Sequence, residues 1–128
     1  LLLRGIEVVQ AVNRGFSPER AFMLLEDEDL LLDVIDLSGL TDSPRQLDRL
    51  RGRIIGKDGR SREQIEHMTE CEISVFGKTV AIIGLPEQIK IARSAIDMLL
   101  QGLPHEMVFS FLERKRREMK QDMIDYYY

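Results

Sequence analysis

The chain has 128 residues, a size that suits one domain with appendages rather than a large enzyme. Its composition is that of an ordinary soluble globular protein, with 44% hydrophobic residues, 31% charged residues and a net charge of −4. No apolar run approaches the ~20 residues that a membrane helix needs, and one cysteine with two histidines argues against a disulfide or a zinc site. We therefore expect a cytoplasmic protein without a metal, another cofactor or a membrane contact.

The first 44 residues combine helical patterns with an acidic charge. Apolar residues at helical spacing predict a helix that ends near Gly15, and Ser17-Pro18 is typical of the start of a second, short helix. The apolar run 30–37 favours a strand, with a helix as the alternative. Nine acids against three bases give this part a charge of −6, which indicates a solvated acidic face or a partner other than nucleic acid.

The middle of the chain predicts two helices, a hairpin and a third helix. Ser43-Pro44 is a cap followed by a first-turn proline, and the helix it opens leads to a loop bounded by Gly56 and Gly59. A second helix follows, then strands at 72–76 and 79–83 joined by Gly77-Lys78. The next helix should cover the sheet with Ile89, Ala92, Ile96 and Leu99, and residues 105–128 predict a charged terminal helix.

The glycine-bounded loop is the strongest functional signal. Glycines allow another backbone to approach closely, and the helix that follows directs the positive end of its dipole at an anion. Seven bases and two acids between Arg45 and Arg62 give a local charge of +5 in an otherwise acidic chain. A strip of phosphates is the partner that such a local positive field favours.

The element order around Gly56-Lys57-Asp58-Gly59 resembles a type I KH domain, in which a GxxG loop between two helices clamps about four nucleotides of single-stranded RNA or DNA. Residues 52–62 (GRIIGKDGRSR), residues 74–84 (SVFGKTVAIIG) and Pro104-His105 before the basic helix are similar to the archaeal KH-domain ribosomal RNA processing family, whose eukaryotic relative is called partner of Nob one. The resemblance implies an α+β fold of order β-α-α-β-β-α, with a three-stranded antiparallel sheet packed by three helices and with flanking terminal helices.

The same resemblance implies a domain division, a function and partners. Residues 1–29 would be the last helix of a truncated first KH-like unit plus a helical linker, residues 30–102 the KH domain and residues 103–128 a charged helix. The start at Leu1 rather than at a methionine fits a chain that is part of a longer protein. The family implies binding near the 3′ end of the small-subunit rRNA precursor, with a Nob-type endonuclease and the alpha subunit of archaeal initiation factor two as partners.

For such a domain we expect the RNA backbone along residues 56–59, with bases across an apolar groove and against the backbone of the strand 72–76. For Ile54 and Ile65 a place in the core is the alternative, and Arg62 is equally well explained as surface charge. Asp58 and Glu72 are acids where relatives favour other residues, which argues for weaker phosphate binding. The expected RNA-binding residues are Arg53, Ile54, Ile55, Gly56, Lys57, Asp58, Gly59, Arg60, Arg62, Ile73 and Val75.

Three alternatives compete with RNA binding. An enzyme is disfavoured, because Gly56-Lys57 is followed by Asp58 rather than by the Ser or Thr of a Walker-type loop, and no nucleophile with a base and an orienting group can be named. A protein-docking adaptor is favoured by the acidic first 44 residues and the charged terminal helix. A general single-stranded nucleic-acid binder is the third, since a GxxG grip does not itself read the 2′-hydroxyl.

Overall fold

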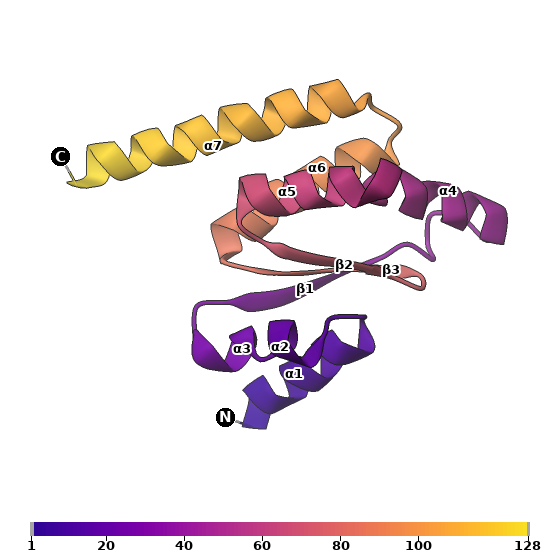
Figure 1. The fold of residues 1–128 in the computed structure, drawn as a ribbon, viewed down its shortest axis with the longest axis horizontal. Helices are drawn as coiled ribbons and strands as arrows, with labels where there is room; N and C mark the ends of the chain where they lie inside the picture. The colour runs from indigo at the N-terminus through magenta and orange to yellow at the C-terminus, as the bar shows by residue number, and fades with distance from the viewer. Residues whose placement is uncertain (1, 128) are drawn as a thin grey trace.

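The computed structural model describes residues 2–127, and a three-stranded antiparallel sheet lies at its centre (Figure 1). The strands are β1 (Leu31–Asp36), β2 (Glu72–Phe76) and β3 (Thr79–Gly84), in the order β1-β3-β2. The three predicted strands are confirmed to within one residue at each end, and the helical alternative for the first is excluded. The predicted terminal segments each contain one residue, Leu1 or Tyr128, that lies outside the described range.

One face of the sheet carries the helices α4 (Pro44–Ile55), α5 (Arg60–Thr69) and α6 (Pro86–Leu100). Ser43 caps α4 as predicted, since its Oγ accepts the N–H of Gln46 at 3.3 Å. The predicted apolar face of α6 is confirmed, and it packs with residues of α4, α5 and the sheet in one cluster whose fully buried members include Ile54, Ile65 and Ile82. This layer places the glycine loop beside the free edge of β2.

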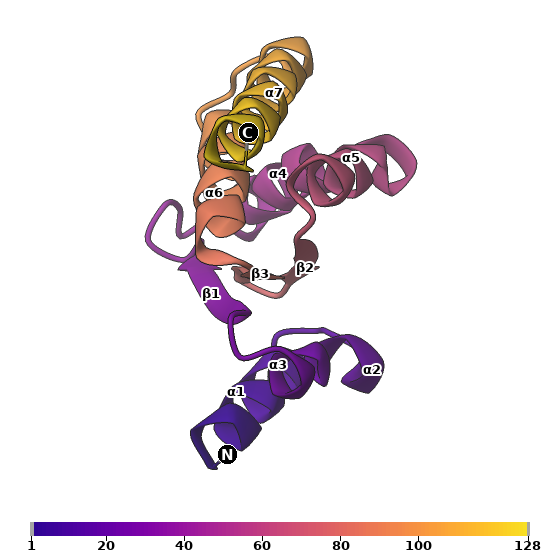
Figure 2. The same cartoon turned by 90° about the vertical axis from the view of Figure 1, so that its left-hand side faces the viewer.

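A second layer covers the opposite face of the sheet and consists of α1 (Leu2–Asn13), α2 (Pro18–Ala21) and α3 (Met23–Glu26), as Figure 2 shows. Its cluster joins Val8 and Phe16 to Ala81 and Ile83 of β3. Because side chains alternate between the faces of a strand, the two layers together bury every residue of β3. The one short helix predicted after Ser17 is instead two, separated at Phe22.

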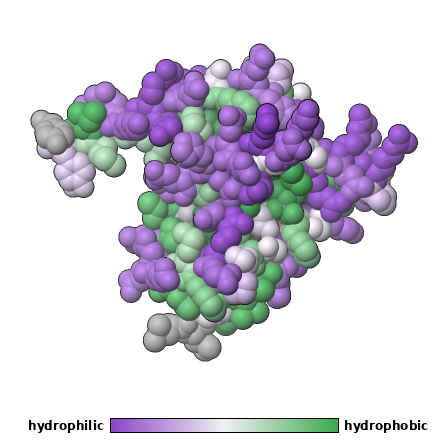
Figure 3. Space-filling model, viewed as in Figure 1, coloured by the Kyte–Doolittle hydropathy of each residue, from purple (hydrophilic) through white to green (hydrophobic). Residues whose placement is uncertain are grey.

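The terminal helix α7 (His105–Tyr127) packs on α5 and α6 and then runs beyond the rest of the molecule (Figure 1). Val108 and Leu112 are buried in the main core, whereas the second half of the helix is exposed. Hydrophilic side chains gather over the layer of α4, α5 and α7, and apolar ones are more prominent over the α1 layer (Figure 3). No helix within residues 2–127 has both the length and the apolar character that crossing a membrane requires.

Candidate nucleic-acid interface

The loop between α4 and α5 is built around two glycines with positive φ. Gly56 ends α4 with φ 74° and ψ 178°, and Gly59 precedes α5 with φ 75°. Between them Lys57 and Asp58 occupy one 3-10 turn with their side chains exposed, and Asp58 itself has φ 56°. Residues with a Cβ seldom adopt these angles, so the glycines stand where the backbone requires them.

Gly56 lies directly against the first turn of α5. A Cβ at this position would be 2.5 Å from the Cβ of Ser61 and 3.0 Å from its backbone nitrogen. The loop backbone is therefore free of side-chain bulk at the point where α5 begins. The first N–H groups of a helix lack intrahelical acceptors and carry partial positive charge, which makes this position suitable for an anion.

Two cations flank the loop with their side chains exposed, Lys57 and Arg60. Within residues 2–127 neither forms an ion pair with another side chain. Their charge is available to a phosphate, as the sequence predicts for both. Asp58 is the only acid of the loop and is also exposed, so solvent screens its effect on neighbouring charges.

Arg53 and Arg62, which the sequence assigned to the same positive surface, have partners within the protein. The guanidinium of Arg53 donates from Nε to the carbonyl of Leu99 at 2.7 Å and from Nη2 to that of Leu103 at 2.6 Å. Arg62 donates to Glu66 at 2.5 Å. Arg53 thus donates to one carbonyl in the last turn of α6 and to one just after it, so its guanidinium has a structural role that the sequence did not predict.

The apolar residues expected in the groove divide into two groups. Ile54 and Ile73 are 0% and 1% exposed and belong to the main core, as does Ile65. The alternative that places Ile54 in the core is therefore the one observed, and the expectation that Ile73 contacts bases is corrected, because its side chain packs in the main core. Ile55 and Val75 are half-buried, so part of each side chain remains accessible to a ligand.

The free edge of β2 is capped at Ile73 by two side chains. Its N–H donates to Oε2 of Glu66 at 2.7 Å, and its carbonyl accepts from Nη2 of Arg20 at 3.4 Å. Arg20 also pairs with Glu66 and with Glu72, each at 2.7 Å. Groups on an antiparallel strand alternate between its two edges, so the backbone of Val75 faces the same edge as Ile73 and is the position left for a base.

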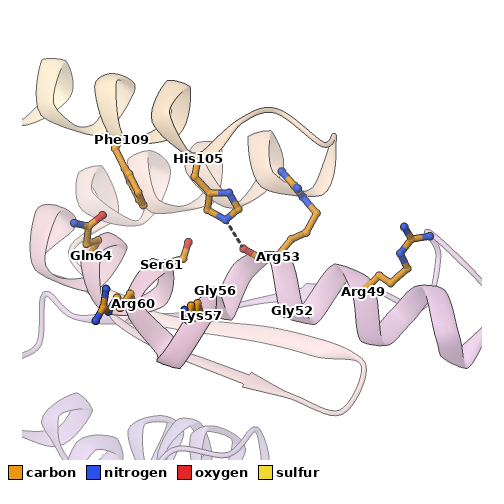
Figure 4. Close-up of a pocket in the computed structure, with 10 residues that line it drawn as sticks. All are labelled: Arg49, Gly52, Arg53, Gly56, Lys57, Arg60, Ser61, Gln64, His105 and Phe109. Carbon is orange, nitrogen blue, oxygen red and sulfur yellow. Dashed lines mark hydrogen bonds between the residues drawn. The ribbon is translucent and has the colours of Figure 1, made fainter.

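Sequence reasoning missed the capping of this edge and a cavity behind the loop. Arg20 and Glu72 are 52 positions apart, and nothing in the local pattern pairs them. The cavity is lined on its far side by His105 and Phe109 of α7, which the sequence treated as part of a charged helix (Figure 4). A serine between Arg60 and Arg62 in the basic segment is the signal that the sequence offered for this cavity.

The described part of the chain, residues 2–127, contains no group of three or more His, Cys, Asp or Glu side chains placed to hold a metal ion. Cys71 lies in the short connection between α5 and β2 with its side chain in the main core, and burial raises the pKa of its thiol to about 11. The Nε2–H of His105 donates to the carbonyl of Arg53 at 3.1 Å, which fixes the ring at the start of α7 (Figure 4).

The site consists of a loop with two positive-φ glycines between two helices, next to a sheet of order β1-β3-β2. This arrangement is found in a known family. The family model of the second KH domain of PNO1, described as the eukaryotic-type KH domain or KH-domain type I, matches residues 31–117, from β1 into α7. The chain belongs to this family. The predicted type I KH fold and the predicted resemblance are thereby confirmed.

Relatives in archaea and fungi share the KH domain. The KH domain-containing protein MJ0443 of Methanocaldococcus jannaschii is 46% identical over 114 residues, covering 89% of this chain and 50% of the relative. The pre-rRNA-processing protein PNO1 of Candida albicans is 31% identical over 121 residues, covering 94% of this chain and 44% of the relative. The chain therefore spans about half the length of the curated relatives it matches.

A solved structure of a KH protein places a relative on RNA. In the complex of a/eIF2alpha, aDim2p and rRNA from Pyrococcus horikoshii, the matching chain is 48% identical with a TM-score of 0.84. The match covers 91% of the present chain and 63% of the other. The fold described above is thus the fold of a protein crystallised with rRNA.

Proposed function

We propose that this chain is an RNA-binding factor that acts in the cytoplasm during processing of small-subunit rRNA and ribosome assembly, gripping single-stranded RNA near the rRNA 3′ end. The observation that carries the proposal is the loop geometry, with Gly56 and Gly59 at positive φ and the start of α5 directly behind them. The pre-rRNA-processing name of the fungal relative and the rRNA complex of the archaeal relative support the choice of RNA. The protein acts by binding rather than by catalysis.

In this mode the RNA backbone lies along residues 56–59, with the charges of Lys57 and Arg60 against its phosphates. The bases enter the groove between Ile55 and Val75, and the backbone of Val75 meets a base edge. Because Ile73 is capped by Arg20 and Glu66, the strand offers fewer reading positions than its length suggests. Sequence selectivity is therefore concentrated on one or two bases.

The test is binding of the chain to short single-stranded RNAs from the 3′ region of small-subunit rRNA, compared with scrambled RNA and DNA of the same length across a salt series. Lys57→Asp reverses the charge at the loop, and Lys120→Asp makes the same change on the exposed end of α7. We expect Lys57→Asp to weaken binding by about 10- to 100-fold, the value of a charge-assisted hydrogen bond, and Lys120→Asp to leave it unchanged.

Binding through several phosphates should also weaken steeply with salt, and Lys57→Asp should flatten that slope. Equal binding by the wild type and the Lys57→Asp variant, both shown to be folded, would contradict the loop assignment. A folded wild type that binds none of the RNAs would contradict the proposed function as a whole.

Protein docking is the second candidate, and the exposed face of α1 favours it. Leu3, Ile6 and Val9 are 75%, 48% and 59% exposed on one side of this helix. We propose that this face belongs to the end of a first KH-like unit, with residues 18–29 as a linker. The alpha subunit of initiation factor two and a Nob-type endonuclease are the proposed protein partners, the first supported by the complex formed by the Pyrococcus relative. Calorimetry with each purified partner, with and without RNA, tests both.

A further inference from the structure

A cavity of about 740 Å³ lies behind the GxxG loop, on the side away from β2 (Figure 4). On α4 it is lined by Arg49, Gly52 and Arg53, which share one side of the helix. Arg51 points the other way and donates to the carbonyl of Gly77 in the β2–β3 turn at 2.9 Å. The cavity and the β2–β3 turn therefore lie against different sides of α4.

A hydroxyl in the wall of the cavity has no hydrogen-bond partner among residues 2–127. Ser61 is 3% exposed, and its Oγ forms no hydrogen bond in the described structure. Its oxygen points into the space between α5 and the residues His105 and Phe109 of α7 (Figure 4). A buried hydroxyl without a partner is unfavourable, so a ligand that supplies one would be bound more tightly at this point. Gln64, one turn further along α5, adds an amide to the same wall.

The charge around this cavity is positive. Arg49, Lys57 and Arg60 line its rim, and none of its ten lining residues is acidic. Arg53 is held by Leu99 and Leu103, so the other three cations carry the charge that a ligand would meet. An anion, or an anionic group on a larger ligand, is what such a rim attracts.

The far wall supplies aromatic surface. Phe109 is half-buried, and its ring centroid lies 6.2 Å from that of His105 at a tilt of 58°. The hydrogen bond from His105 to the carbonyl of Arg53 holds this wall against α4. A base can stack on an aromatic ring whatever its identity, while hydrogen-bonding groups such as Ser61 and Gln64 can meet its edge. One cavity therefore offers cations for a phosphate, Ser61 and Gln64 for the edge of a base, and Phe109 for its face.

Resting on the proposed function, we infer that this cavity binds one further nucleotide of the RNA strand, adjacent to those held across the GxxG loop. Its phosphate lies against Arg60 and Arg49, its base stacks on Phe109, and Ser61 with Gln64 contacts the base edge. The strand then bends around the loop, from the groove beside β2 to the cavity beside α7. The terminal helix thereby becomes part of the RNA-binding surface and lengthens the site.

A length series of RNA tests the inference. The affinities of four-, five- and six-nucleotide RNAs from the same sequence are measured for the wild type, Phe109→Leu and Phe111→Leu. Phe111 is on the same helix and half-buried, but it lines other surfaces, so it is the matched control. We expect the affinity of the wild type to rise by about 5- to 150-fold when the strand exceeds four nucleotides, the value of one base stacked on an aromatic ring. Phe109→Leu should lose this gain and keep the four-nucleotide affinity, and Phe111→Leu should keep both.

A second experiment measures whether the cavity binds a free mononucleotide, and its result does not depend on the affinity of the protein for RNA. Adenosine and uridine monophosphates are titrated into the labelled protein while the amide resonances of Ser61, Gln64 and Phe109 are followed, with Ser61→Ala as the variant that lacks the hydroxyl. Shifts at these residues that weaken in Ser61→Ala support the cavity even if RNA binding fails, in which case only the proposed function falls. RNA binding with no gain beyond four nucleotides and no such shifts overturns the cavity and leaves the proposed function standing. Equal loss of the gain in both phenylalanine variants also overturns it, because the effect would then come from the stability of α7.

Discussion

Replacing Gly56 by alanine tests the geometry on which the loop depends. The angles of Gly56, φ 74° and ψ 178°, lie in a region that only glycine adopts readily, and forcing alanine there costs about 1–3 kcal/mol. The new Cβ would also be 2.5 Å from the Cβ of Ser61, and moving α5 to relieve such overpacking costs about 1–3 kcal/mol more. We expect Gly56→Ala to lower the free energy of unfolding by about 2–6 kcal/mol, a large share of the total stability of a typical domain.

Gly52→Ala is the matched control, one turn earlier in α4. No atom lies within 4 Å of the position that its Cβ would occupy, and its backbone is helical. Alanine should therefore raise the free energy of unfolding by about 0.4–1 kcal/mol, since it restricts the unfolded chain and favours helix. The measurement is urea denaturation of both variants with the same m-value.

A double variant separates the two causes. Ser61→Gly removes the Cβ that the new methyl group would strike, so Gly56→Ala should cost less in this background. The part that remains reports the backbone angles together with the 3.0 Å contact to the backbone nitrogen of residue 61. A Gly56→Ala variant as stable as the wild type would refute the reasoning. A similar loss of unfolding free energy in Gly52→Ala would also refute it, because alanine at either position of this segment would then destabilise the protein regardless of the geometry of Gly56.

Three further predictions follow from individual side chains. Arg53→Ala should lower the free energy of unfolding by about 1–3 kcal/mol, because it removes both hydrogen bonds and leaves the carbonyl of Leu103 without this donor, whereas that of Leu99 keeps the N–H of Gly102. An unchanged urea midpoint would contradict the role given to Arg53 at the end of α6. Because burial raises the pKa of the Cys71 thiol from its usual 9.0 to about 11, the folded state holds the thiol proton more tightly. The contribution of this group to stability is therefore present below pH 9 and lost as the pH rises toward 11, and iodoacetamide at pH 8 should label Cys71 only after denaturant is added. With the RNA backbone along the loop as proposed, Asp58→Gly removes a carboxylate close to the phosphates and a residue with φ 56°, so RNA binding should tighten by about 2- to 10-fold at low salt, where screening is weakest. Unchanged affinity at low salt would contradict this position of the backbone.

Local signals accounted for the elements and for the loop. Ser43 with Pro44 starts α4, and Gly56 and Gly59 supply the positive φ angles that follow it. Such features depend on residues within a few positions of one another, so the sequence contains all the information they need. The three-stranded antiparallel sheet followed from the resemblance to type I KH domains and is present in the structure, and the family match confirms the type I KH fold. The order β1-β3-β2 within the sheet came from the structure.

The roles of single side chains depended on distant partners. The sequence placed Arg53 at the phosphates, yet Leu99 and Leu103, 46 and 50 positions later, take its guanidinium. Ile54 and Ile55 are adjacent isoleucines that the sequence does not distinguish. Ile54 is fully buried and Ile55 is half-buried, because they face different sides of α4. Charge and hydrophobicity predict which residues could contact a ligand, and packing decides which of them are accessible.

The sequence by itself determined the secondary structure, the glycine loop and the positive charge around it, since each follows from local propensity or composition. Only the tertiary structure brought Arg20 to the edge of β2, placed α1–α3 against the second face of β3 and set Phe109 opposite Ser61. These contacts join segments tens of residues apart, and their geometry is fixed by the burial of apolar surface on both faces of the sheet. Which groups surround the loop on its two sides is therefore a property of the packed molecule rather than of any segment of the chain.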